Sequence, residues 1–381
     1  MLFTNLSLKA KRILVTRVVC VSWLVAKSIS WKLWLAYRLF PVVPPFDFLF
    51  VPQAVHLIFY IISLSCIAAV LIFPSKRILL LSVILIELLS CSLDQNRWQS
   101  WEYQYIFIMV AILINRRNEI NALHSIAFIF ISTYFFSGLS KINPGFSGYV
   151  QRELVSFGIF KVRDSYFYNL VIYHAGYLAG VIEMLLAAGL LFKRTLKAAA
   201  VLLICMHLGI LILLGPLGVN YNIIIWPWNI GMIICIYLLF LNGDYFILSI
   251  ISLKAGFNKV FILFFGLLPF LNFFGYWDYF LSSSLYSFKP PQMYICIHDT
   301  VRTHALSTFF IKNKHTFICD NSSTLLNVQS WSMQEMAVPA YPEIRVYKKI
   351  KDHLLSRYPN MQATFIIYKY AGGEIKRTEL K

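Results

Sequence analysis

The chain has 381 residues, of which 59% are hydrophobic and only 13% charged, and its mean hydropathy is +0.68. Since a soluble domain carries about 25% charged residues, this composition excludes an ordinary soluble protein and indicates a membrane protein. The formal net charge of +17 raises the question of nucleic-acid binding, but the basic residues cluster in short loops between apolar runs, as in membrane proteins. We therefore expect the lipid bilayer as partner, and no nucleic acid.

Apolar runs of bilayer-crossing length recur along the sequence, since a helix needs about 20 apolar residues to cross. The first run contains Arg17 and Lys27. It could span the membrane with both charges reaching towards the surfaces, or lie flat in the interface; we favour spanning. The nine expected spans are residues 13–30, 53–73, 78–93, 103–114, 123–139, 168–192, 198–214, 223–241 and 260–274.

After about residue 280 the charges, glycines and prolines reach the level of a soluble domain. Residues 293–297 and 363–368 are rich in β-branched and aromatic residues, which is typical of strands. Residues 342–357 predict an amphipathic helix with proline in its first turn. We predict an all-α polytopic membrane helix bundle of about 8–9 transmembrane helices and a small C-terminal α+β extramembrane domain, covering residues 1–280 and 290–381.

Loop charges predict the orientation. With nine spans and the N-terminus inside, the inner loops hold more lysine and arginine than the outer ones. The positive-inside rule then predicts a multi-pass protein of the cell membrane with a cytosolic N-terminus and the C-terminal domain outside. If the first run lies flat, the tail is cytosolic, provided that the loop preference still holds for the remaining spans. Cys296 and Cys319 offer a test, because they could form a disulfide outside, whereas free thiols would favour the cytosol.

Glu87, Glu183 and His207 are ionisable residues that lie inside expected spans. Each costs about 2.5–3.5 kcal/mol at a helix centre, so such residues either pair inside the bundle or serve a function. Lys141 stands where a span ends at an Asn-Pro-Gly turn. It is either an anchor that reaches the interface or, if desolvated, a neutral amine that can act as a base. The cysteine and histidine spacings predict no metal site.

The stretch around this lysine resembles a known family. Tyr134–Tyr149 reads YFFSGLSKINPGFSGY. It is similar to a segment of vitamin K-dependent gamma-carboxylases, in which two aromatics, a small residue, Gly and an aliphatic residue precede Lys-Leu-Asp. It also resembles the wider horizontally transferred transmembrane (HTTM) domain family. The resemblance implies that Lys141 corresponds to the catalytic lysine that deprotonates reduced vitamin K.

Other stretches follow in the order of that family. Asp94, Trp98 and Tyr103 match a carboxylase segment in which an active-site histidine stands where this chain has Trp101. Met206-His207 resembles the family's Phe-His-x-x-Asn, with Ile210 at the Asn position, and Glu183 falls near an acidic residue of the preceding helix. Residues 268–287 and 331–343 resemble bacterial members. The resemblance implies Lys141 and His207 as catalytic residues, with site-lining candidates Asp94, Trp98, Trp101, Tyr103 and Glu183.

Two main functional hypotheses follow. One is a membrane-embedded enzyme, carboxylase-like or oxidoreductase-like, in which Lys141 is a base acting on a quinone-like lipid or an exported protein substrate at the outer rim of the membrane. By resemblance its cofactor would be a reduced quinone. The other is a non-catalytic membrane component that binds a lipid or a partner protein and has lost the carboxylase chemistry. A transporter is disfavoured because we find no inverted repeat. A cavity beside Lys141 lined by His207 or Glu183 would favour the enzyme, and Trp101 filling it would exclude one.

Overall fold

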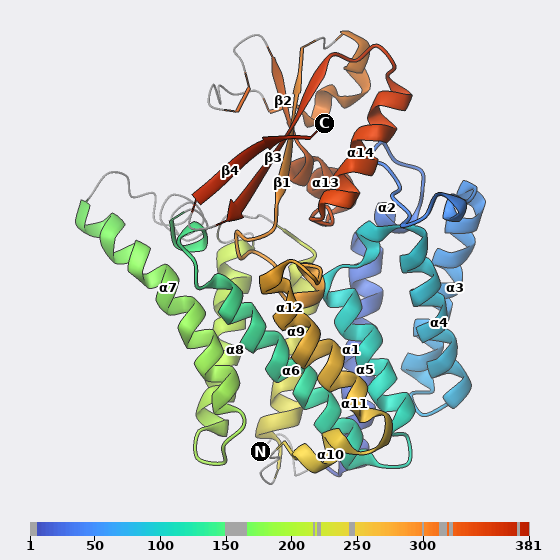
Figure 1. The fold of residues 1–381 in the computed structure, drawn as a ribbon. Helices are drawn as coiled ribbons and strands as arrows, with labels where there is room; N and C mark the ends of the chain where they lie inside the picture. Colours follow the sequence, from blue (N-terminus) through green and yellow to red (C-terminus); the bar gives the residue numbers. More distant parts are fainter. Residues whose placement is uncertain are drawn as a thin grey trace.

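The fold is mostly helical, with a small antiparallel sheet near the C-terminus (Figure 1). The computed structural model describes residues 6–148, 166–215, 218, 222–243, 248–298, 301–311, 318–319, 323–371 and 374–380. The helices of the bundle are α1 (Leu8–Ile29), α2 (Trp31–Trp34), α3 (Gln53–Ile72), α4 (Arg77–Leu93), α5 (Ser100–Ile114), α6 (Glu119–Lys141), α7 (Tyr166–Gly189), α8 (Leu196–Leu214), α9 (Ile225–Ile236), α10 (Ile250–Lys254), α11 (Lys259–Phe261) and α12 (Leu268–Leu271).

Several of these helices have the length and composition of membrane spans. Within the described part of the chain, four stretches are long and apolar enough to cross a membrane: Gln53–Ile72, Glu119–Lys141, Leu196–Leu214 and Gly256–Phe274. Shorter apolar helices cover Ser100–Ile114 and Ile225–Leu241. The last long stretch changes to a π-helical segment (Ile262–Leu267) just before Pro269, and proline cannot donate the backbone hydrogen bond of a regular helix.

Apolar side chains also point outwards from the bundle, as lipid contact requires. Those of α3, α4, α7 and α8 that are exposed include Leu57, Ile58, Ile61, Leu85, Leu89, Leu178, Ile182, Leu202 and Ile212. Only about a quarter of the apolar windows of α3 and α8 is buried, against 78% for α6. The bundle is therefore organised around α6, and its outer helices present hydrocarbon to their surroundings.

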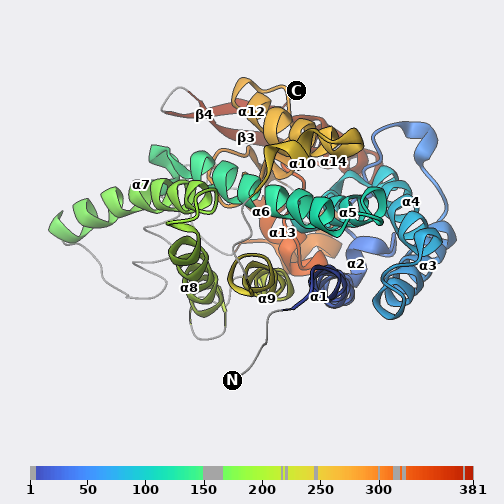
Figure 2. The same ribbon diagram turned by 90° about the horizontal axis from the view of Figure 1, so that it is seen from below.

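Helix α1 runs alongside the other helices and contacts α3 and α9 (Figure 2). Arg17 is exposed, but the expectation that Lys27 reaches the surface is wrong. Lys27 Nζ lies 2.6 Å from Glu87 Oε2, and both side chains are 0% exposed. Ser63 Oγ donates a hydrogen bond to the other oxygen of Glu87. Lys27 is stabilised by its ion pair with Glu87 inside the bundle and not by contact with water, because a buried charge must be paired.

The C-terminal sheet has the strand order β2-β1-β3-β4, and all neighbours are antiparallel. The predicted strands at residues 293–297 and 363–368 are confirmed as β1 and β3. Strands β2 and β4 and helix α13 lie outside the sequence prediction. The predicted helix begins at Ile344, with Glu343 as its N-cap, so Pro342 precedes it. The elements of this region are β1 (Gln292–Ile297), β2 (Thr324–Asn327), α13 (Val328–Met336), α14 (Ile344–Arg357), β3 (Ala363–Ala371) and β4 (Glu374–Glu379).

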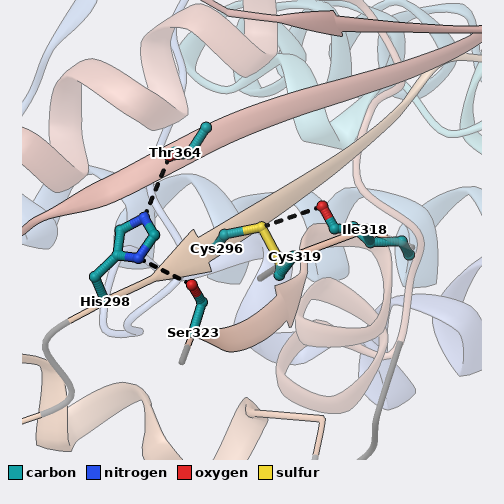
Figure 3. The surroundings of a disulfide bond; sticks show 6 residues. All are labelled: Cys296, His298, Ile318, Cys319, Ser323 and Thr364. Atoms are coloured by element: carbon teal, nitrogen blue, oxygen red, sulfur yellow. Dashed lines mark hydrogen bonds between the residues drawn. A yellow bond between two sulfur atoms is a disulfide. The ribbon is translucent and has the colours of Figure 1, made fainter. Parts of the chain in front are cut away.

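A disulfide joins Cys296 of β1 to Cys319, which precedes β2, with a Cα–Cα distance of 5.6 Å (Figure 3). Beside it, the ring nitrogens of His298 lie 2.9 Å from Ser323 Oγ and 3.3 Å from Thr364 Oγ1. The bond and these contacts hold together three segments that are distant in sequence.

The C-terminal region sits on one end of the bundle (Figure 1). The Glu335 carboxylate of α13 accepts hydrogen bonds from the backbone N–H groups of Leu39 and Phe40, at 2.6 and 2.8 Å. The Phe40 ring lies 4.8 Å from that of Trp331. The C-terminal end of α6 is also joined to this region, because Asn143 Nδ2 donates a hydrogen bond to the backbone carbonyl of Ser287. Lys141 therefore lies at the end of the bundle that carries the sheet.

Candidate functional site

A cavity of about 230 Å³ lies at the end of α6, between α6, α7, α8 and α9 and beneath the segment that leads to β1. Its walls are largely apolar, and the polar side chains in them belong to a few residues from α6 to α9. The lining residues include Tyr134, Ser137, Lys141, Phe146, Glu183, Met206, His207, Ile210, Leu214, Trp228, Asn229, Met232, Leu285 and Tyr286. Apolar walls with few convergent polar groups are the usual composition of a ligand site.

Lys141 lies in the wall of this cavity and forms an ion pair there. Its Nζ donates to Glu183 Oε2 at 2.5 Å and to Ser137 Oγ at 2.9 Å. The Lys141 side chain is 17% exposed and that of Glu183 is 6% exposed. Tyr134, Ser137 and Lys141 are three and four residues apart, so they form one stripe of α6 facing the cavity. In this arrangement the lysine is an ammonium held by a carboxylate, and one proton transfer would convert it to an amine.

The ion pair depends on a close approach of α6 and α7. A Cβ built on Gly138 would lie 2.6 Å from the carbonyl oxygen of Gly180 and 2.6 Å from the backbone nitrogen of Met184. A Cβ on Gly180 would lie 2.8 Å from the Gly138 carbonyl oxygen. Small residues allow this backbone contact between membrane helices. The contact brings Glu183, three residues beyond Gly180, against Lys141, three residues beyond Gly138.

A second polar group in the wall is a chain of three side chains. Tyr134 Oη lies 2.6 Å from His207 Nε2, and His207 Nδ1 lies 2.6 Å from Asn229 Oδ1. The amide nitrogen of Asn229 donates to the Ile225 carbonyl, so its oxygen is the acceptor. His207 therefore donates through Nδ1, and its Nε2 accepts the tyrosine proton when the ring is neutral. This network gives the cavity an oriented hydroxyl and imidazole.

The structure thus brings together Lys141, Glu183 and His207 from the sequence-based candidates. It does not bring Asp94 to them. Asp94 pairs with Arg38 and accepts hydrogen bonds from the backbone of Val43 and Asn96. Burial alone would raise the pKa of Asp94, but the charges of Arg38 and Arg97 hold that pKa below its ordinary value. Its position indicates a structural role, fixing the loop that follows α2.

Trp98, Trp101 and Tyr103 also lie outside the cavity lining. Trp101 is buried, with its ring 6.3 Å from that of Trp34 and 6.1 Å from that of Tyr105. The Tyr103 ring stacks on an aromatic ring of the Gly256–Phe274 stretch. Its centroid lies 6.4 Å from that of the Trp98 ring. Trp101 therefore does not fill the space beside Lys141.

Sequence reasoning missed Tyr134, Ser137 and Asn229. The two residues of α6 were predictable, because their spacing from Lys141 is helical. Asn229 carried a weaker signal, a single amide inside an apolar span, and only the fold shows that it supports His207. Within the described residues, no group of three or more His, Cys, Asp or Glu side chains is placed to hold a metal ion.

Comparison with known proteins leaves the site to be interpreted from its chemistry. No protein-family model, curated protein or solved structure matches the chain. The geometry offers a titratable amine–carboxylate pair, an oriented Tyr–His–Asn chain and an apolar wall in one small cavity. That combination is suited to binding a small ring system with polar substituents and to exchanging a proton with it.

Proposed function

We propose that the chain is a membrane-embedded enzyme that binds the ring of a quinone-like lipid in the Lys141 cavity and removes a proton from its reduced form. The observation that carries this proposal is the placement of Lys141, Glu183 and His207 in the wall of one apolar cavity. Its volume of about 230 Å³ lies just below the range of about 300–1,000 Å³ for drug-sized ligands. A single small ring system fits this size better than a whole lipid.

The proton chemistry would use the pair as a unit. A ring entering the cavity displaces water and removes solvation from the ammonium and the carboxylate, which lowers the cost of the neutral pair relative to the ion pair. Transfer of one proton from Lys141 to Glu183 leaves an amine lone pair. That amine accepts the proton of a hydroquinone hydroxyl, and the hydroquinone becomes an oxyanion. The Tyr134–His207 pair would position a second polar substituent of the ring.

The resemblance of the Lys141 stretch to the HTTM and gamma-carboxylase family is consistent with this chemistry, and carboxylation of an exported protein would be one use of the activated quinone. We also propose that the bundle crosses the membrane about 8–9 times, with the N-terminus in the cytosol and the C-terminal domain outside. Arg12 near the N-terminus pairs with Glu119 and donates to Ser75, so the basic turns before α4 and α6 share one end of the bundle. The disulfide at the other end supports an oxidising compartment there.

The test uses the full chain in lipid nanodiscs with menadiol, a reduced naphthoquinone. Binding is followed through Trp228, which lines the cavity, and Trp228→Phe identifies its share of the fluorescence. Consumption of menadiol under oxygen measures the reaction. We expect Lys141→Arg to bind but not react, because a guanidinium does not release its proton, and Lys141→Ala to be inactive as well. Full activity of Lys141→Arg would refute a base at this position.

A second candidate is a non-catalytic membrane component that binds a lipid or a partner protein. The observation that favours it is that Lys141 already donates to both Glu183 and Ser137, as a purely structural cation would. The same experiment separates the two functions. Saturable binding of menadiol by the wild type, with no consumption above that of empty nanodiscs, would select the non-catalytic function.

A further inference from the structure

A second and larger cavity, of about 740 Å³, lies at the end of the bundle that carries the sheet. It is enclosed by the loop between α2 and α3, the first turn of α3, and helices α13 and α14. It shares no residue with the Lys141 cavity. Its lining residues include Trp31, Lys32, Tyr37, Phe50, Gln53 and Arg357.

The charge of this cavity is positive. Lys32 and Arg357 contribute full positive charges from two separate elements of its wall. The acidic residue in the wall, Glu335, keeps its negative charge, and its two oxygens accept hydrogen bonds from the backbone N–H groups of Leu39 and Phe40. Arg38 pairs with a carboxylate outside the cavity. Lys32 and Arg357 together outweigh the charge of Glu335, so the wall keeps a net positive charge, which favours an anion.

Exposed aromatic residues surround the cavity on the loop side. The exposed fractions are 45% for Trp31, 78% for Tyr37, 60% for Phe46, 80% for Phe48 and 64% for Phe50. The Phe46 and Phe48 rings stack with centroids 5.5 Å apart. Tryptophan and tyrosine, here Trp31 and Tyr37, are typical of the membrane–water interface. The loop connects directly to α3, the most apolar of the four candidate spans.

The outward face of α3 begins at the cavity. Gln53 lines the cavity, and Leu57 and Ile61 follow it at intervals of four residues, so they lie on the same face of the helix, with exposed fractions of 47% and 54%. A ligand in the cavity would therefore have a cationic pocket at one end and an apolar helix face below it. This is the complement of an amphiphile with an anionic head and hydrocarbon chains.

We propose that this cavity binds the phosphate headgroup of an anionic phospholipid. Lys32 and Arg357 receive the phosphate, the aromatic loop lies at headgroup depth, and the acyl chains run along α3. A soluble phosphate compound shares the headgroup chemistry but lacks the chains. An acidic peptide shares the charge but would not use the α3 face.

The test measures lipid adducts on the full chain by native mass spectrometry in detergent, with phosphatidylglycerol or phosphatidylcholine of the same acyl chains. Each cation near a headgroup is worth about 1 kcal/mol, a factor of about five, so we expect at least about fivefold more phosphatidylglycerol on the wild type. Lys32→Gln/Arg357→Gln should bring the two lipids to within about twofold. The control Lys376→Gln/Arg377→Gln removes the same charge from β4, outside the cavity, and should keep the preference.

Equal binding of the two lipids by the wild type would overturn the proposal without reference to any variant. Loss of the preference in the β4 control would show a non-specific charge effect and would also overturn it. Glycerol 3-phosphate is added as a competitor. Displacement of phosphatidylglycerol by equimolar glycerol 3-phosphate would assign the site to a soluble phosphate, and an acidic peptide that binds in place of both lipids would assign it to a protein partner; either result refutes a lipid site.

Discussion

Replacing Gly138 by alanine tests whether the contact of α6 with α7 builds the Lys141 site. The added Cβ would lie 2.6 Å from the Gly180 carbonyl oxygen and the Met184 nitrogen, about 0.8 Å short of ordinary van der Waals contact at 3.4 Å. Both atoms belong to the backbone, so no side chain can rotate away. The helices must separate, and Glu183 moves with α7 away from Lys141.

The magnitude follows from two terms. Overpacking a tight contact costs about 1–3 kcal/mol of stability. Lengthening the 2.5 Å contact between Lys141 and Glu183 by roughly 0.8 Å removes about 1–2 kcal/mol of Coulomb energy at an effective dielectric constant of 20. We therefore expect Gly138→Ala to lower the Tm by several degrees. We also expect it to reduce menadiol consumption by about tenfold or more, because Glu183 must lie within hydrogen-bond distance to take the proton from Lys141, and such a positioned proton acceptor contributes about 10²–10⁴-fold.

The assay pairs thermal unfolding, followed by tryptophan fluorescence in detergent, with menadiol consumption in nanodiscs. Gly209→Ala is the matched control, since a Cβ there meets nothing within 4 Å and the residue lies in α8. It should preserve both the Tm and the rate. Wild-type stability and rate in Gly138→Ala would refute the reasoning that this contact sets the position of Glu183.

Three further predictions concern the buried ion pair, the disulfide and the pH dependence. Lys27→Met should destabilise the bundle by about 3–5 kcal/mol, because it leaves Glu87 buried without a cation, and Lys27→Met/Glu87→Leu should recover most of the loss in thermal unfolding. Cys296→Ala should lower the stability of the C-terminal region by about 3 kcal/mol, because the bond closes a loop with a sequence separation of 23, measured as faster proteolysis of that region. Burial and the charge of Asp278 raise the pKa of Glu343 to about 7. Folding therefore favours its protonated form, so stability falls by about 3 kcal/mol as the pH rises from about 4.5 to 7, and Glu343→Gln should flatten the Tm between pH 5 and 8.

Each of these has a result that contradicts it. Equal destabilisation by Lys27→Met and by the double variant would show that volume rather than charge decides. A Cys296→Ala protein with wild-type protease resistance would show that the loop is held by other contacts. A Glu343→Gln protein that keeps the wild-type slope of Tm against pH would place the titrating group elsewhere.

Composition and hydropathy predicted most of the helical bundle, because apolar length is a property of each segment alone. The strands β1 and β3 were predictable for a similar reason, since β-branched and aromatic residues concentrate in them. Strand β4 was not, because its sequence EIKRTE is charged and every residue in it is exposed. It forms an edge of the sheet through backbone pairing with β3, which leaves no apolar pattern to detect.

The site was predictable only in part. Lys141 and His207 stand out because ionisable residues are costly in apolar surroundings. Their shared cavity depends on the approach of α6 and α7 and on the support of Asn229, which are contacts between segments far apart in the sequence. Asp94 shows the converse. A match of short motifs placed it with the site, whereas its pairing with Arg38 makes it part of the loop structure.

Two lysine–glutamate pairs in this chain differ in their packing, and the difference bears on the proposed role of Lys141. Lys27 and Glu87 are both 0% exposed, and the Lys27 ammonium lies 3.1 Å from the centroid of the Trp34 ring, which closes it off. Each partner of this closed pair needs the other, because an unpaired buried charge is strongly destabilising. The Lys141 pair has the same chemistry but lines a cavity, and Lys141 keeps 17% of its side-chain surface exposed. An opening beside an ion pair costs packing energy, and this difference supports the proposal that the Lys141 cavity admits a ligand.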